Sequence, residues 1–161
     1  MGKYSEALTF AASLCSTSEQ CAFDILRKTA KFELDTDEKE KMIQALRQNG
    51  FIDDQRFVKA FVNDRLHFNK WGRMKIGYML KQKGIDNTII ETNLNDIDED
   101  AYTETLLNLL KQKSKSANSR NQIELKSKLY RFAQGKGYES SAIGKCLKQM
   151  KLDFDETEFS E

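Results

Sequence analysis

Residues 73–97, RMKIGYMLKQKGIDNTIIETNLNDI, align without a gap on residues 126–150, KSKLYRFAQGKGYESSAIGKCLKQM. The aligned positions that match in apolar character or in glycine are Ile76 with Leu129, Gly84 with Gly137, Ile90 with Ile143, and Leu94 with Leu147. A weaker copy lies at residues 21–50 and lacks the glycine that Gly84 and Gly137 share. Self-similarity with a period of about 50 residues is typical of helical repeat arrays, in which each repeat packs on its neighbours.

The spacing of apolar residues predicts about nine helices. The chain has no proline and only eight glycines among its 161 residues, so helix breakers are scarce. The expected helices span residues 4–15, 18–31, 36–48, 54–68, 73–83, 87–96, 100–113, 121–135 and 140–150. They group into triplets, so we predict an all-α fold, an elongated array of three tandem three-helix repeats at 1–50, 51–98 and 99–151. Residues 152–161 form an acidic tail that we expect to be disordered.

Residues at the ends of the expected helices have the chemistry of helix caps. Side chains that can accept hydrogen bonds from first-turn amides are Ser18, Asp54, Asp86 and Ser140. Glycines suited to a left-handed residue at a helix end are Gly50, Gly84 and Gly137.

Composition restricts the class of protein. The three cysteines form no C-x-x-C pair and the chain has one histidine, so we expect reduced thiols and neither a metal nor a cofactor. No apolar run is long enough to span a bilayer, and no stretch resembles a signal peptide. We therefore expect a soluble, cytoplasmic protein that does not bind membranes. The net charge is only +1, but basic and acidic residues alternate in blocks along the chain.

The stretch NGFIDDQRFVKAFVNDR, residues 49–65, raises the question of whether two adjacent aspartates form an active site. Asp54 is expected at a helix start, where a carboxylate caps amides, and no nearby residue supplies a nucleophile or base partner. Phe68 is expected on the apolar arc of the same helix, and Arg65 lies near the middle of that arc. Arg65 is therefore either a structural ion pair or a contact for a partner.

Other candidate chemical motifs are incomplete. GRMKIGYM at 72–79 lacks the Lys and Ser/Thr of a phosphate loop, and GKGYES at 135–140 lacks the strand of a dinucleotide site. DIDED at 96–100 lacks the glycine and glutamate of a calcium loop, and His67 stands alone. We therefore predict no catalytic residues and no enzyme activity.

Basic residues interleaved with aromatics are the strongest signal for binding. KWGR at 70–73 places a tryptophan between cations at a helix joint, ahead of a basic helix face, and a related stripe recurs in the third repeat. Such residues suit phosphate and base contacts or protein interfaces, but they also suit a tryptophan packed in the joint and solvated lysines. The residues predicted to bind a partner are Arg65, Lys70, Trp71, Arg73, Lys75, Lys81, Lys126, Lys128 and Arg131.

With these motifs in view, the chain resembles the RecX family of bacterial regulatory proteins. The resemblance rests on SEQ at 18–20, GFIDDQRFVKAFVNDR at 50–65 and KWGRMKIGYMLKQKGI at 70–85, and extends more loosely to IGKCLKQM at 143–150.

The resemblance implies tandem three-helix repeats and a non-enzymatic modulator of the RecA recombinase. Such a protein binds the RecA filament on single-stranded DNA and commonly suppresses ATP hydrolysis, strand exchange and co-protease activity in recombination and the SOS response. We expect a monomer whose main partner is the filament, with single-stranded DNA a secondary, weak and salt-sensitive ligand. The alternative is a helical scaffold or nucleic-acid-binding module that acts without RecA.

Overall fold

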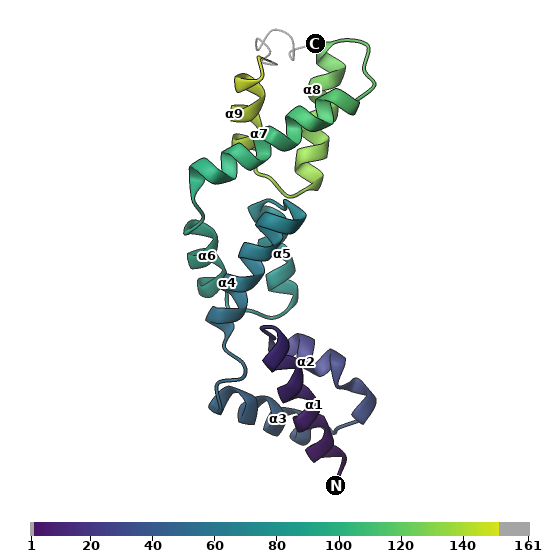
Figure 1. The fold of residues 1–161 in the computed structure, drawn as a ribbon, viewed down its shortest axis with the longest axis vertical. Helices are drawn as coiled ribbons and strands as arrows, with labels where there is room; N and C mark the ends of the chain where they lie inside the picture. Colours follow the sequence, from purple (N-terminus) through teal and green to yellow (C-terminus); the bar gives the residue numbers. More distant parts are fainter. Residues whose placement is uncertain (1, 152–161) are drawn as a thin grey trace. The chain divides into compact units, whose positions relative to one another are not determined.

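The computed structural model describes residues 2–151, and within that range the chain forms nine α-helices, two short helical turns and no strand (Figure 1). The all-α, helical-repeat prediction is confirmed. The chain divides into two compact units. The first unit runs to Asn63 and includes Met79–Asn93, and the second comprises Asp64–Tyr78 and the chain from Leu94. The predicted acidic tail lies outside the described residues.

The first unit contains the helices α1 (Lys3–Thr17), α2 (Ala22–Lys28), α3 (Thr36–Gln48), most of α4 (Asp54–Asp64) and α6 (Asn87–Asn95). Helix α3 begins with a capping box, in which Asp35 and Glu38 each bond the other's backbone amide. One buried cluster of this unit comes from α1, α2, α3 and the segments that follow α2 and α3: Ala7, Ala11, Ile25, Leu34, Met42, Leu46 and Ile52. Alanines four residues apart in α1 allow neighbouring chain segments to approach closely.

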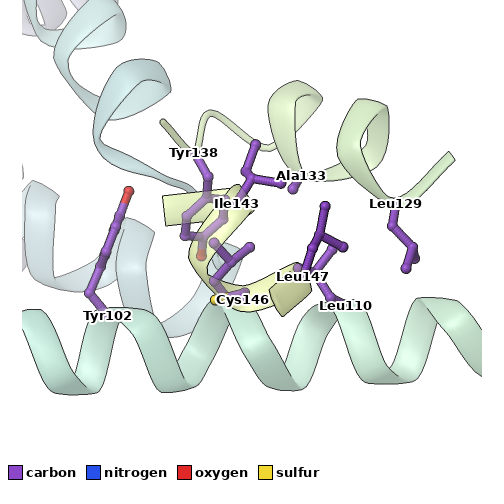
Figure 2. Packing of buried hydrophobic residues seen from close by; sticks show 9 residues of the cluster. Tyr102, Leu110, Leu129, Ala133, Tyr138, Ile143, Cys146 and Leu147 are labelled. Atoms are coloured by element: carbon purple, nitrogen blue, oxygen red, sulfur yellow. The ribbon is translucent and has the colours of Figure 1, made fainter. Parts of the chain in front are cut away.

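The second unit is built around the helix α7 (Glu99–Ser116), against which α8 (Gln122–Gly135) and α9 (Ser140–Gln149) pack. Figure 2 shows side chains of α8 and α9 directed toward α7. The buried cluster comprises Tyr102, Leu106, Leu110, Leu129, Ala133, Tyr138, Ile143, Cys146 and Leu147. Helix α5 (Arg73–Gln82) begins in this unit and ends in the first.

Two backbone segments of the second unit interlock at glycines. The Gly72 amide donates to the Lys136 carbonyl at 2.8 Å, and the Met74 amide donates to the Gly137 carbonyl at 2.9 Å. A Cβ on Gly72 would lie 2.4 Å from the Gly137 carbonyl oxygen. Only glycine permits this approach, which joins the start of α5 to the turn before α9.

The predicted caps are partly confirmed. Gly50, Gly84 and Gly137 all have positive φ, and Asp86 accepts a hydrogen bond from the Thr88 amide. Two caps are wrong. The second helix begins at Ala22, so Ser18 ends α1 instead, and the residue before α9 is Glu139 rather than Ser140.

The two aspartates also divide their roles differently from the prediction. Asp53 rather than Asp54 accepts the hydrogen bond from the first-turn amide of Arg56, at 3.1 Å. Asp54 is the first residue of α4, and its carboxylate pairs with Arg47 at 3.2 Å. The aspartates start a helix, as expected, but the cap lies one residue earlier.

Candidate partner-binding surface

The joint between α4 and α5 is a π-helical turn, Arg65–Asn69, followed by Lys70 in the left-handed conformation (φ 56°, ψ 39°). The Trp71 amide donates to the Arg65 carbonyl at 3.0 Å and closes the turn. Residues of the turn between α8 and α9 also bind the joint. Lys136 Nζ donates to the Asn69 carbonyl at 2.8 Å, and the Tyr138 hydroxyl donates to the Lys70 carbonyl at 2.9 Å.

Trp71 contacts two cations. The guanidinium carbon of Arg65 lies 5.6 Å from the indole centroid, and Lys75 Nζ lies 4.5 Å from it. Arg65 Nη1 also donates to Asn69 Oδ1 at 2.7 Å. Both cations are therefore within the range of a cation–π contact with this half-buried ring.

Large apolar side chains around this joint are exposed to solvent. Phe68 is 81% exposed, Met74 64% and Tyr78 61%. Met74 and Tyr78 are four residues apart on α5 and share one face. The prediction that Phe68 belongs to the apolar arc of its helix is wrong, because the π-helical turn changes the angular register of the residues after Asp64.

Arg73, predicted to contact a partner, is bonded inside the second unit. Its guanidinium donates to the Leu94 carbonyl at 3.0 Å and pairs with Glu139 at 3.1 Å and with Glu99. Its side chain is only 15% exposed. Burial opposes its charge, but the hydrogen bonds that the guanidinium donates to Glu139 and Glu99 outweigh that effect and raise the pKa of Arg73.

Tyr102 completes this network. Its hydroxyl accepts from the Arg73 amide at 2.9 Å and donates to Glu139 through a short hydrogen bond, and the Arg73 guanidinium carbon lies 4.3 Å from its ring. Burial, together with the hydrogen bond to Glu139, raises the pKa of Tyr102 well above its usual range. The phenol therefore stays protonated at neutral pH and donates permanently.

The predicted residues Lys126, Lys128 and Arg131 lie along α8. Lys128 pairs with Glu124 at 3.2 Å and donates to the Asn118 carbonyl. The hydrogen bond from the Arg120 amide and the one from Lys128 lower the pKa of Glu124. Arg131 is exposed and lines two hollows, one with Lys113, Lys128 and Phe132, the other with Lys126. Lys113 Nζ lies 5.2 Å from the Phe132 centroid.

The predicted binding residues do not form a single cluster in the structure. Arg65, Trp71 and Lys75 form one cation–aromatic cluster, while Lys126, Lys128 and Arg131 follow one helix. Lys81 is exposed in the last turn of α5 and belongs to the first unit.

Sequence reasoning missed the internal networks. Nothing in the spacing of Arg73, Tyr102 and Glu139 indicates that they meet, because the residues are far apart in the chain. The same holds for Lys83, which pairs with the buried carboxylate of Asp24 at 2.7 Å in the first unit.

The described residues also bear on three further features: a metal site, a reactive cysteine and a membrane-spanning helix. Residues 2–151 contain no cluster of three His, Cys, Asp or Glu side chains placed to hold a metal ion. Their cysteines form no disulfide, and burial raises the pKa of Cys21 to about 11, which keeps its thiol protonated. In the same range no helix is both long and apolar enough to cross a membrane.

Comparison with known proteins gives a consistent result. The family model for the second three-helix domain of RecX matches residues 53–94. The regulatory protein RecX of Chlorobium phaeobacteroides is 30% identical over 145 residues, which cover 90% of this chain and 93% of the relative. The RecX protein of Clostridium acetobutylicum is 32% identical over 115 residues, covering 69% of this chain and 53% of the relative. The chain thus spans about half the length of that clostridial relative.

Solved structures support the same fold. The crystal structure of RecX from Lactobacillus salivarius superimposes with a TM-score of 0.77 at 19% identity, covering 93% of this chain and 97% of that one. A second crystal structure of a regulatory protein RecX gives a TM-score of 0.80 at 19% identity, covering 92% of this chain and 73% of that one.

Proposed function

This chain belongs to the RecX family of regulatory proteins, and from that premise we propose that it binds the RecA filament on single-stranded DNA and lowers the filament's activities. The activities concerned are ATP hydrolysis, strand exchange and co-protease action in recombination and the SOS response. It acts as a monomer in the cytoplasm, by binding and without catalysis of its own.

One observation carries the proposed binding surface. The α4–α5 joint presents a tryptophan flanked by Arg65 and Lys75, with Phe68, Met74 and Tyr78 exposed nearby in sequence. Monomeric proteins seldom leave so many large apolar side chains in water close to fixed cations unless a partner covers them. Aromatic and arginine side chains are enriched among residues that carry binding energy.

We assign the predicted residues different parts in this binding. Lys70, Lys75 and Lys81, with Lys126, Lys128 and Arg131, contact acidic filament surfaces or DNA phosphate. Arg65 and Trp71 contribute through their stack. Arg73 positions the joint from inside and does not contact the partner itself, since its guanidinium already binds Glu99, Glu139 and the Leu94 carbonyl.

The exposed aromatics also favour the second candidate, a module that binds single-stranded nucleic acid without RecA, because bases stack on aromatic side chains with little sequence preference. The net charge of +1 favours a weak, salt-sensitive contact of this kind.

The experiment that tests the proposal is the single-stranded-DNA-dependent ATPase of RecA from the same organism, titrated with this protein at near-physiological salt. Suppression at protein levels below those needed to coat the DNA supports action on the filament. The double variant Lys70→Glu/Lys75→Glu should require at least tenfold more protein for half-maximal suppression. Lys111→Glu/Lys115→Glu, an equal charge change at exposed sites on α7, is the matched control.

Circular dichroism checks that both variants keep their helical content. Undiminished inhibition by the folded Lys70→Glu/Lys75→Glu protein would remove the joint from the proposed surface. Binding to naked DNA with no effect on RecA would favour the second candidate instead.

A further inference from the structure

The groove between α8 and α9 has a mixed lining. Its volume is about 430 Å³, and it is lined by Lys126, Ser127, Tyr130, Arg131, Gly144 and Leu147. The Tyr130 hydroxyl donates to Ser140 Oγ at 2.6 Å, so the phenol is already bonded and the ring is the part offered to the groove. Leu147, the Tyr130 ring and the missing side chain at Gly144 give an apolar floor, and Lys126 and Arg131 supply cations.

Gly144 is what opens this groove. A Cβ built on Gly144 meets no atom within 4 Å, and the residue lies inside α9. Glycine in a helix interior costs about 0.5–1 kcal/mol relative to alanine, so the opening exists at the expense of helix stability.

The lining specifies the chemistry of an occupant. An apolar floor bordered by lysine and arginine fits a segment that carries aromatic anchors between carboxylates. A nucleic acid strand fits less well, because its phosphates gain nothing from the leucine and the open space at glycine.

We propose that this groove binds residues 152–161 of the same chain, LDFDETEFSE. The segment has five acidic residues, no basic residue and two phenylalanines, Phe154 and Phe159, so it has both features that the groove accepts. It begins three residues after the end of α9, which itself contributes Gly144 and Leu147.

The C-terminal segment is long enough to reach the groove. Gly144 lies about 8 Å along the helix axis from the end of α9, because each helical residue adds about 1.5 Å. Four extended residues span about 13 Å, enough to return from Lys151 to the groove. Tethering also raises the effective concentration of the segment to the millimolar range, so weak contacts suffice.

Docking of this segment would shield Lys126 and Arg131. An anionic partner that uses these side chains would then have to displace the segment. The docking itself does not depend on RecA or DNA, so it is tested without either.

The test records amide nuclear magnetic resonance signals of the full chain. Replacement of both anchors, Phe154→Ala/Phe159→Ala, should shift the signals of Ser127, Tyr130, Gly144 and Leu147 and leave those of the first unit unchanged. Gly144→Leu, which fills the groove, should change the signals of residues 152–161. Gly135→Leu is the matched control, since Gly135 is also a helical glycine with open space at its Cβ but lies outside the groove.

Two further measurements vary the salt concentration and the protein concentration. Raising the salt from about 50 to 500 mM should reproduce the shifts of the anchor variant, since screening weakens the charge contacts. Groove signals that ignore the anchor substitutions would overturn the proposal. So would shifts that grow with protein concentration together with a doubled mass in light scattering, because the occupant would then come from a second copy.

Discussion

Residues 73–97 and 126–150 build the same pair of helices and use their aligned polar positions for different purposes. Both segments turn at a glycine with positive φ, and in both the next residue donates to a carbonyl five positions earlier. Yet Arg73 is bonded inside the second unit, while its aligned counterpart Lys126 lines a groove. The apolar repeat determines the helices, whereas the role of each polar position depends on what packs against it.

The first prediction concerns the two turn glycines and has the largest expected effect. Gly84→Ala should cost about 1–2 kcal/mol of unfolding free energy, because alanine is strained at positive φ. Gly137→Ala should cost on the order of 3 kcal/mol or more, because its Cβ would also lie 2.3 Å from Lys75 Cβ and 2.7 Å from the Lys75 amide nitrogen. Urea unfolding followed by circular dichroism measures both.

Equal losses at the two glycines would mean that the backbone around Lys75 relaxes freely. The interlock at Gly72 and Gly137 would then be less rigid than its geometry indicates.

The second prediction compares Arg73 with Lys126. Arg73→Ala should lower the unfolding free energy by about 2–4 kcal/mol, because it leaves the half-buried Glu139 without its cation. Lys126→Ala should change it by about 0.5 kcal/mol or less, as for most surface substitutions. Arg73→Lys should recover only part of the loss, since an ammonium cannot serve Glu99, Glu139 and the Leu94 carbonyl together.

The same urea titrations decide this comparison. A large loss of unfolding free energy in Lys126→Ala and a small one in Arg73→Ala would contradict the assignment of Arg73 as the internally bonded cation and Lys126 as the surface cation.

The third prediction concerns the pH dependence of the Arg73 network. Tyr102→Phe should cost about 1–2 kcal/mol at neutral pH, because it removes a donor to Glu139 and an acceptor for the Arg73 amide. The folded-state pKa of Tyr102 is raised, so its stabilising contribution is fully present below the usual tyrosine pKa of about 10 and declines as the pH rises above it. The stability difference between the two proteins should therefore stay constant up to about pH 10 and shrink as the pH rises further.

Comparing both proteins cancels the titration of groups that they share. A difference that grows at alkaline pH would mean that the folded state favours the phenolate, contrary to the burial of Tyr102.

The sequence alone predicts the features that depend on contacts between residues close together in the chain, and it misses those that depend on distant residues. Helices such as Thr36–Gln48 are predicted to the residue, because caps and apolar spacing are local signals. Phe68 is misplaced because the π-helical turn at Arg65–Asn69 changes the register, and that joint is held in part by Lys136 and Tyr138, which lie far away in the sequence.

The candidate surface likewise combines contacts that are local in the sequence with one that is long-range. The cation–aromatic stack at Trp71 involves residues within eleven positions of one another and is predictable as a basic, aromatic joint. The capture of Arg73 by Glu139 spans 66 positions, so no local pattern distinguishes it from an exposed cation.

The smallest expected effect lies at the aligned pair Glu91 and Gly144. Gly144→Ala should raise the unfolding free energy by about 0.5–1 kcal/mol, because the added methyl meets open space and alanine favours a helix. Glu91→Gly should lower it by a similar amount, and also removes the hydrogen bond between Asn87 and Glu91 at 3.0 Å. Urea titration of both variants measures the pair. A stability gain at Gly144 would show that glycine there disfavours the helix, so that what it provides is the open space of the groove. A loss would mean that the methyl group hinders the proposed docking of residues 152–161 by more than it favours the helix, and the anchor variant Phe154→Ala/Phe159→Ala would then abolish the loss.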